Sequence, residues 1–191
     1  MDLQKSQSLL CQAESSQLLI IDVQTKLGGA MPGKVFDRVV KNATLLLKTA
    51  QRMGMPILVS EQYPKGLGPS DPGLAENLSE STPRFEKTCF SCANAEGFVD
   101  TLKGAQRPQA ILVGMEAHVC VLQTAFGLAQ QGFQVFVVED AICSRRLENY
   151  QNALARMQQG GIVLTNAESV VFEWLKDARN EHFKAIAELL S

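Results

Sequence analysis

The stretch Leu18-Leu19-Ile20-Ile21-Asp22 decides the fold class of this chain. Its four consecutive aliphatic residues predict a buried strand, which we expect to span residues 18–23. Asp22 directly follows these four apolar residues, near the expected end of the strand. Ligands of open parallel α/β sheets bind outside the carboxyl ends of the strands, so a carboxylate at this point is a candidate for chemistry.

Outward from this stretch, strand-like runs alternate with helix-like segments along the chain. Further strands are expected at residues 57–60, 84–88, 110–114, 133–138 and 162–165, and helices at 34–53, 95–103, 119–131, 148–159, 167–177 and 182–190. This alternation indicates βαβ units with right-handed crossovers. We therefore predict a single α/β domain over residues 1–191. Its expected architecture is a three-layer α/β/α Rossmann-like fold with a six-stranded parallel sheet in the order 3-2-1-4-5-6.

Composition excludes several classes of function. The 191 residues carry 18 basic and 20 acidic side chains, so no basic excess exists to neutralise the phosphates of a nucleic acid. No apolar run approaches the roughly 18–20 residues of a membrane span, and the polar N-terminus lacks a signal-peptide core. The five cysteines are irregularly spaced, which disfavours a disulfide framework. We expect a cytoplasmic protein with free thiols, no cofactor and no membrane partner; the usual glycine-rich nucleotide loops are missing.

Two further reactive residues stand near expected strand ends. Lys87 lies in Arg84-Phe85-Glu86-Lys87-Thr88, and Cys120 follows the 110–114 strand in a turn that leads into a helix. A helix N-terminus favours a thiolate and lowers its pKa, so Cys120 is a candidate nucleophile. Asp22 could then be its general base, and Lys87 could stabilise negative charge. Taken singly, each also fits an ordinary role: a buried cysteine, a loop-capping aspartate and a surface lysine.

Other candidates have weaker support from their spacing. His118 is two residues from Cys120, and residues two apart on a helix do not face each other, so it is expected to line a pocket or cap the helix. Cys89 and Cys92 form a single Cys-x-x-Cys, whereas structural zinc needs four ligands; two ordinary thiols are favoured.

The sequence allows more than one role for two further segments. The basic pair Arg145-Arg146 follows an expected loop at 139–144, with a solvated surface as the default and contact with the site or an interface as the alternative. The Pro- and Gly-rich residues 61–83 predict a long loop, and a loop of this length is usually functional or disordered.

Taken together, several segments resemble the isochorismatase-like cysteine hydrolase superfamily, and most closely its isochorismatase-domain-containing proteins. The matching segments are LLIIDVQ (18–24), SEQYPKGLG (60–68), FEKTCFS (85–91), GMEAHVCVLQTA (114–125) and VFVVEDAICSR (135–145). The resemblance extends from about Ser16 to Leu190. The combination is specific, although any one of these segments alone would be weak.

The resemblance implies roles for individual residues. The catalytic triad of the superfamily falls on Asp22, Lys87 and Cys120. A non-proline cis peptide falls on Met115–Glu116, and it is expected to aim the backbone N–H of Glu116, with that of Cys120, at an oxyanion. For substrate binding we expect Tyr63 and His118.

Two differences from other members of the superfamily reduce the number of reactions expected of this chain. Glu61-Gln62-Tyr63 stands where nicotinamidases of the superfamily carry a metal-binding Asp-x-His motif, so no catalytic metal is expected. True isochorismatases, which cleave a vinyl ether, lack the nucleophilic cysteine, so Cys120 argues against that reaction.

What remains is hydrolysis of an amide, ureido or related C–N bond of a small molecule through a thioester. The main alternative is a catalytically idle binding or scaffolding protein on the same fold. A third possibility, a thiol redox protein, would need a reversible disulfide between Cys89 and Cys92.

A homo-oligomer, most simply a two-fold dimer, is also expected. The apolar residues of 170–190 and the weakly self-ordering 61–83 loop could both be covered by a partner surface. The alternative is that the C-terminal tail packs on its own sheet.

Overall fold

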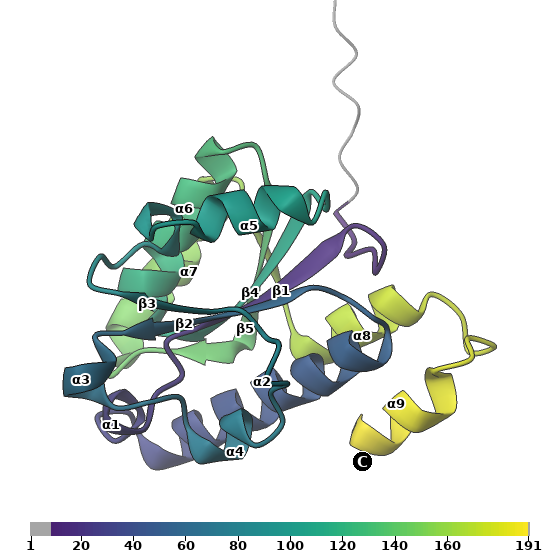
Figure 1. The fold of residues 1–191 in the computed structure, drawn as a ribbon, viewed down its shortest axis with the longest axis horizontal. Helices are drawn as coiled ribbons and strands as arrows, with labels where there is room; N and C mark the ends of the chain where they lie inside the picture. The colour runs from purple at the N-terminus through teal and green to yellow at the C-terminus, as the bar shows by residue number, and fades with distance from the viewer. Residues whose placement is uncertain (1–8, 191) are drawn as a thin grey trace, which may run out of the picture.

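The computed structural model describes residues 9–190, which fold around one six-stranded sheet (Figure 1). Every pairing is parallel, and the strand order is β3-β2-β1-β4-β5-β6, as predicted. The strands are β1 (Ser16–Ile21), β2 (Ile57–Gln62), β3 (Arg84–Lys87), β4 (Gln109–Met115), β5 (Gln134–Cys143) and β6 (Val163–Thr165).

Helices cover both faces of the sheet and complete the three layers (Figure 1). One face carries α2 (Gly33–Arg52), α4 (Pro72–Ala75), α8 (Ala167–Leu175) and α9 (Phe183–Leu190). The other carries the 3₁₀ turn η1 (Cys92–Asn94), α5 (Phe98–Gly104), α6 (Leu122–Gln130) and α7 (Leu147–Gln159). Two short helices, α1 (Thr25–Gly28) and α3 (Pro64–Leu67), lie together beyond the carboxyl ends of β1 and β2.

β1 shows why the apolar run forms the centre of the sheet. Leu18 and Ile20 point into the core beneath α2 and α8, whereas Leu19 and Ile21 point into the core beneath α5 and α6. All four side chains are at most 1% exposed. Burying a side chain of this size contributes roughly 1.5–3 kcal/mol, so a strand apolar on both faces is stable only between two helical layers.

The structure corrects the expected end of β5. Residues 139–143, expected as part of a loop, continue the strand to Cys143, and the register against β4 shifts between Leu112 and Gly114. Glu139 and Asp140 made this part of the sequence look like a loop. Both are partly exposed, and Asp140 Oδ1 accepts the backbone N–H of Ala167 at 2.8 Å, which fixes the start of α8.

The segment 61–83 is also more structured than its composition indicated. It contains the end of β2 and the short helices α3 and α4. The Glu61 carboxylate accepts the backbone N–H and the hydroxyl of Ser70 at 2.7 and 2.6 Å, and Gln24 Nε2 donates to the Gly68 carbonyl at 2.6 Å. Buried polar side chains of the chain itself therefore hold this segment, although it has few aliphatic residues to order it.

The C-terminal tail packs on its own domain, which was the alternative to a partner surface. Val171, Trp174, Leu175 and Ile186 are at most 2% exposed in the core that α2 shares with the sheet. Trp174 also donates its indole N–H to the Ser16 hydroxyl at 3.2 Å. Most of the tail is thus covered within the chain itself, and Phe172 of α8 stays 45% exposed.

Candidate active site

The reactive residues converge at the carboxyl ends of neighbouring strands. Asp22 directly follows β1, Lys87 ends β3, and Cys120 lies in a single π-helical turn, η2 (Ala117–Val121), between β4 and α6. Short π-helical turns are often found at functional sites. β2 separates β3 from β1 in the sheet, and its Ser60 lies between Asp22 and the η1 turn. The predicted convergence of the three residues is what the structure describes.

Asp22 and Lys87 form a buried ion pair. The Lys87 Nζ atom lies 2.7 Å from Asp22 Oδ2, and the two side chains are 1% and 0% exposed. The ammonium also donates to Gln62 Oε1 at 2.7 Å and to the Phe90 carbonyl at 3.1 Å. Burial lowers the pKa of Lys87, but the interactions led by the negative charge of Asp22 outweigh it, so the pKa is raised overall. Lys87 is therefore a fixed cation.

Asp22 is held in one orientation by its neighbour Ser60. The Asp22 backbone has a φ of 52°, in the left-handed region that aspartate tolerates better than most residues. Its N–H donates to the Ser60 carbonyl at 3.0 Å, and the Ser60 hydroxyl donates to Asp22 Oδ1 at 2.7 Å. Because Lys87 occupies Oδ2, each carboxylate oxygen has a donor, and the plane of the carboxylate is fixed.

The thiol of Cys120 is hydrogen-bonded to Asp22 and only 5% of the residue is exposed. Burial and the negative charge of Asp22 raise the pKa of the thiol far above its usual range, and Lys87 offsets only part of this rise. The expected lowering of the Cys120 pKa by a helix N-terminus is therefore wrong. The resting pair is a neutral thiol beside a carboxylate that can take its proton.

A close approach between two strands lies directly under this pair. Gly114 has a φ of 119°, and a Cβ atom on it would lie 1.9 Å from the Ile21 carbonyl oxygen. Only glycine fits here, so the end of β4 can lie against the residue that precedes Asp22.

The Met115–Glu116 peptide is cis, as the resemblance implied. The Glu116 side chain turns toward Arg145, whose backbone N–H and Nε donate to Glu116 Oε2 at 2.9 and 3.1 Å. Arg145 therefore touches the second residue of the cis peptide although its side chain is 58% exposed, and Arg146 is exposed as well. Both residues of the basic pair thus lie on the solvated surface, and Arg145 in addition contacts Glu116.

His118 and Tyr63, the two expected substrate contacts, lie outside the hydrogen-bonded cluster. The His118 ring faces Ser144 Oγ at 2.9 Å and Asn149 Nδ2 at 3.3 Å, so both ring nitrogens have partners near the start of α7. Tyr63 is 54% exposed, and its N–H donates to the Lys87 carbonyl at 2.8 Å. Tyr63 and Lys87 line a hollow of about 340 Å³ beside β3.

Three residues of the site were missed from the sequence: Ser60, Gln62 and Cys92. The Cys92 thiol is fully buried and donates to Ser60 Oγ at 3.3 Å. Cys89, by contrast, donates to the Ser91 carbonyl at 3.4 Å, and all five cysteines are free thiols. The two cysteines of the Cys-x-x-Cys therefore have separate partners. A polar Ser60 at the end of the apolar run 57–59 was the available signal.

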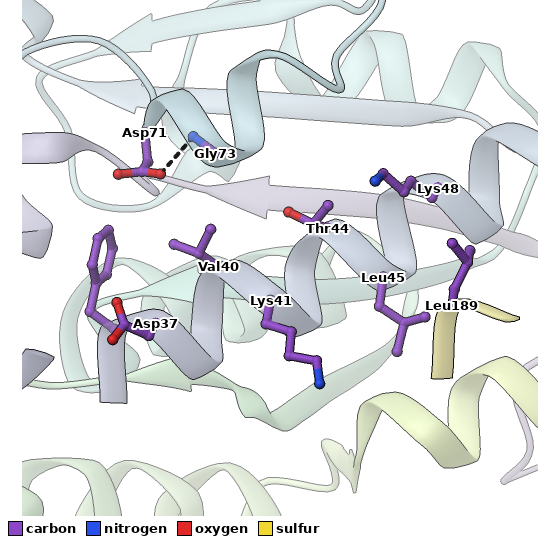
Figure 2. A pocket seen from close by; sticks show the side chains of 10 residues that line it. Asp37, Val40, Lys41, Thr44, Leu45, Lys48, Asp71, Gly73 and Leu189 are labelled. Carbon is purple, nitrogen blue, oxygen red and sulfur yellow. Dashed lines mark hydrogen bonds between the residues drawn. The ribbon is translucent and has the colours of Figure 1, made fainter. Parts of the chain in front are cut away.

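A hollow of about 460 Å³ lies apart from this cluster, along the outer side of α2 (Figure 2). Val40, Thr44 and Leu45 of α2 face it, with Leu189 of α9 at one end and Asp71, whose Oδ1 accepts the Gly73 N–H at 3.0 Å, at the other. It contains no nucleophile paired with a base. The chemistry therefore places the candidate site at the strand ends instead.

Within residues 9–190, no cluster of three or more His, Cys, Asp or Glu side chains is arranged to hold a metal ion. Over the same residues, no helix combines the length and the apolar character needed to cross a bilayer.

Comparison with known proteins gives consistent matches over most of the chain. The family model of the isochorismatase domain matches residues 16–169. Isochorismatase domain-containing protein 2 of Danio rerio is 38% identical over 180 residues, covering 93% of this chain and 88% of the relative. Isochorismatase family protein 1B of Dictyostelium discoideum is 33% identical over 179 residues, with coverages of 92% and 86%.

Solved structures agree with the sequence matches. The MAR1 ribonuclease of Caenorhabditis elegans superposes with a TM-score of 0.89 at 37% identity, covering 95% of this chain and 92% of that one. YcaC of Escherichia coli, described as an octameric hydrolase of unknown specificity, has a TM-score of 0.89 at 25% identity, with coverages of 97% and 91%. YcaC of Pseudomonas aeruginosa, solved with covalent acrylamide, has a TM-score of 0.84 at 26% identity, with coverages of 94% and 91%. With the fold, the strand-end cluster and these matches in agreement, the chain belongs to the isochorismatase family.

Proposed function

We propose that this chain is a cysteine hydrolase that cleaves an amide, ureido or related C–N bond of a small molecule through a thioester intermediate. The observation that carries the proposal is the buried Asp22 carboxylate, which contacts a fixed cation, Lys87, and a neutral thiol, Cys120. A nucleophile and an electrostatic partner thus both contact the same base.

In the first half-reaction, Asp22 takes the proton of Cys120 as the sulfur attacks the substrate carbonyl carbon. The new S–C bond converts the carbonyl oxygen to an oxyanion, which the backbone N–H groups of Glu116 and Cys120 are proposed to bind. Asp22 then gives its proton to the departing nitrogen, the C–N bond breaks, and a thioester remains on Cys120.

In the second half-reaction water is the nucleophile and the Cys120 sulfur is the leaving group. Asp22 removes a proton from water as the water oxygen attacks the thioester carbon. The C–S bond then breaks, the acid product leaves, and Asp22 returns the proton to Cys120. Lys87 keeps a positive charge beside the carboxylate throughout and limits the cost of moving negative charge to sulfur. The scheme requires neither a metal nor another cofactor, and Tyr63 and His118 remain proposed as substrate contacts.

The relatives support parts of this proposal. The hydrolase description of E. coli YcaC agrees with hydrolysis as the reaction class. Acrylamide is an electrophile that thiolates attack, so the covalent acrylamide of P. aeruginosa YcaC fits a nucleophilic site on this fold. The ribonuclease name of the C. elegans relative is not extended to this chain, since its net charge of −2 provides no phosphate-neutralising excess.

A homo-oligomer is proposed as the working form. The octameric state of E. coli YcaC supports it, as do the aromatic side chains of Tyr63 and Phe90, which are 54% and 53% exposed near Lys87. Large exposed aromatic groups are enriched at protein interfaces.

The test is a screen of small amides and ureides with hydroxylamine present, which converts a thioester to a hydroxamate. Wild-type protein is expected to consume a substrate and release a hydroxamate, and Cys120→Ala to do neither while keeping its fold. Cys11→Ala, which removes a buried thiol before β1, serves as the matched control and should keep full activity. Substrate consumption that persists in Cys120→Ala would refute the cysteine mechanism. If nothing is consumed and Cys120 reacts with acrylamide no faster than in Asp22→Asn, the idle scaffold is the better description.

A further inference from the structure

The Asp22 carboxylate is the end of a buried hydrogen-bond chain. The Cys92 thiol donates to Ser60 Oγ at 3.3 Å, and the Ser60 hydroxyl donates to Asp22 Oδ1 at 2.7 Å. The three residues are at most 1% exposed. No part of the hydrolytic scheme uses Cys92, yet its thiol is two hydrogen bonds from the proposed general base.

The chemistry of the three groups fixes which of them donates in each of these two hydrogen bonds. Burial, followed by the charge of Asp22, raises the pKa of the Cys92 thiol to about 11, so the thiol is a proton donor at neutral pH. A serine hydroxyl has one proton and two lone pairs. Because Cys92 donates to a lone pair of Ser60, the Ser60 proton is left to point at Asp22.

Cys92 is itself held by the element that follows the nucleophile. Its backbone N–H donates to Thr124 Oγ1 of α6 at 2.9 Å, and Thr124 is fully buried. Gly127 of the same helix has no room for a side chain, since a Cβ atom would lie 2.8 Å from the Cβ of Ala93. The chain of hydrogen bonds therefore links α6, which begins two residues after Cys120, to the carboxylate that faces Cys120.

We propose that Ser60 and Cys92 are positioning residues, which hold the Asp22 carboxylate in the orientation that receives the Cys120 proton. The inference rests on the proposed function, in which Asp22 is the base. Without the Ser60 proton, buried Oδ1 loses its donor, and the Lys87 contact with Oδ2 is no longer sufficient to fix the plane of the carboxylate. Without the Cys92 thiol, the Ser60 hydroxyl loses the contact that sets its direction.

Acrylamide alkylation of Cys120 tests this without a known substrate. The sulfur bonds to the terminal alkene carbon while Asp22 takes the thiol proton, which is then delivered to the neighbouring carbon. With a working internal base, the rate should be nearly independent of pH around neutrality. When only free thiolate reacts, the rate rises about tenfold per pH unit below the thiol pKa. Peptide mass spectrometry of Cys120 between pH 6 and 9 distinguishes the two profiles.

For Ser60→Ala we expect alkylation at pH 7 to fall by about tenfold, and for Cys92→Ala by about threefold, both with the rising profile. Cys92→Ser keeps a donor at this position and should return the rate to within about twofold of wild type. Cys11→Ala removes a buried thiol at the opposite end of β1 and should alter neither rate nor profile. Thermal unfolding of each variant shows whether a slower alkylation is caused by misfolding. If Cys92→Ala misfolds, the rate of Cys92→Ser is the measurement that tests the role of Cys92.

The outcomes separate this inference from the function it rests on. If Asp22→Asn lowers the rate while Ser60→Ala and Cys92→Ala match wild type in rate and profile, the positioning role is refuted and the base remains. If Cys92→Ser is as slow as Cys92→Ala, the contact with Ser60 is not what matters, and the role of Cys92 is refuted. If Asp22→Asn itself reacts as fast as wild type, both proposals fail together.

Discussion

The ammonium of Lys87 lies 2.7 Å from the carboxylate of Asp22, and neither side chain is more than 1% exposed. Removing two charges from water is costly, and their attraction repays that cost only when further hydrogen bonds complete both groups. Here Ser60 completes Asp22, and Gln62 with the Phe90 carbonyl completes Lys87. The two charges thus compensate each other, so removing one of them should lower the free energy of unfolding more than removing both.

Lys87→Met should therefore destabilise the protein by about 3–5 kcal/mol, because it leaves the Asp22 charge buried without a partner. The double variant Asp22→Asn with Lys87→Met should recover most of that loss. Lys176→Met is the matched control: it breaks a 2.6 Å pair with Glu14 in which both side chains are more than half exposed, and should cost less than about 1 kcal/mol. Urea unfolding measures all three. Equal losses in the single and double variants would contradict the interpretation.

The buried thiols predict a loss of stability at alkaline pH. Burial is the main cause that raises the pKa of Cys92 from 9.0 to about 11 and that of Cys143 from 9.0 to about 12. Above pH 9 the unfolded chain releases these protons and the folded chain retains them, so the free energy of unfolding falls as pH rises. Each thiol contributes at most about 1.4 kcal/mol per pH unit between pH 9 and its folded pKa.

Urea titrations under reducing conditions at several values between pH 7.5 and 10.5 measure this slope. Cys143→Ala should show a shallower decline than wild type by the contribution of one thiol, whatever its stability at pH 7.5. Identical slopes would show that the Cys143 thiol does not contribute. Lys87, whose pKa is also raised, retains its proton in this range and adds a further decline only above about pH 10.5.

A site residue can be predicted from the sequence only where the residues next to it in the chain mark it. Asp22 could be found because four aliphatic residues in a row mark a buried strand and its end. Ser60 was indicated only by its polar side chain after the apolar run 57–59, and Cys92 by no local pattern, because their contacts join β2 and η1 to Asp22 across the fold. The direction of the Cys120 pKa was mispredicted for the same reason: burial and the charge of Asp22 are tertiary effects.

Strand boundaries show the same limit. Aliphatic runs located five of the six strands, whereas β3, Arg84–Lys87, has no aliphatic residue; the strand order followed from the crossovers. The second half of β5 was missed because Glu139 and Asp140 are polar, and their exposure and the α8 contact became visible only in three dimensions.

Gly114→Ala should destabilise the protein by about 2–4 kcal/mol and slow alkylation of Cys120. A Cβ atom would lie 1.9 Å from the Ile21 carbonyl, so the ends of β1 and β4 would have to separate beneath Asp22. Gly33→Ala is the control, because nothing lies within 4 Å of its Cβ position at the start of α2. That variant should match or exceed wild type in thermal unfolding. A stable Gly114→Ala with a normal alkylation rate would contradict the close approach.

The proposed oligomer makes a prediction for the mass in solution. Light scattering at micromolar concentration should give a multiple of the 20.9 kDa chain. Replacing Phe90, which is 53% exposed, by Ser should shift the mass toward that of the monomer. Phe172→Ser, at an aromatic residue 45% exposed on α8, is the control and should leave the mass unchanged. A mass near 21 kDa for fully active wild-type protein would rule the oligomer out.

The cluster takes Asp22, Ser60, Lys87 and Cys120 from four adjacent strands or the turn after them, spread over about half the chain. Contacts this distant in sequence form late, after the entropy of closing the intervening loops has been overcome. A chain emerging from the ribosome, or one cut before β4, would thus have its acid and its cation but no nucleophile, and a partly folded one would have a thiol without its base. Alkylation that is nearly independent of pH would require the completed sheet, because an unfolded Cys120 thiol reacts only as free thiolate, so the pH profile of Cys120 alkylation reports correct folding as well as catalysis.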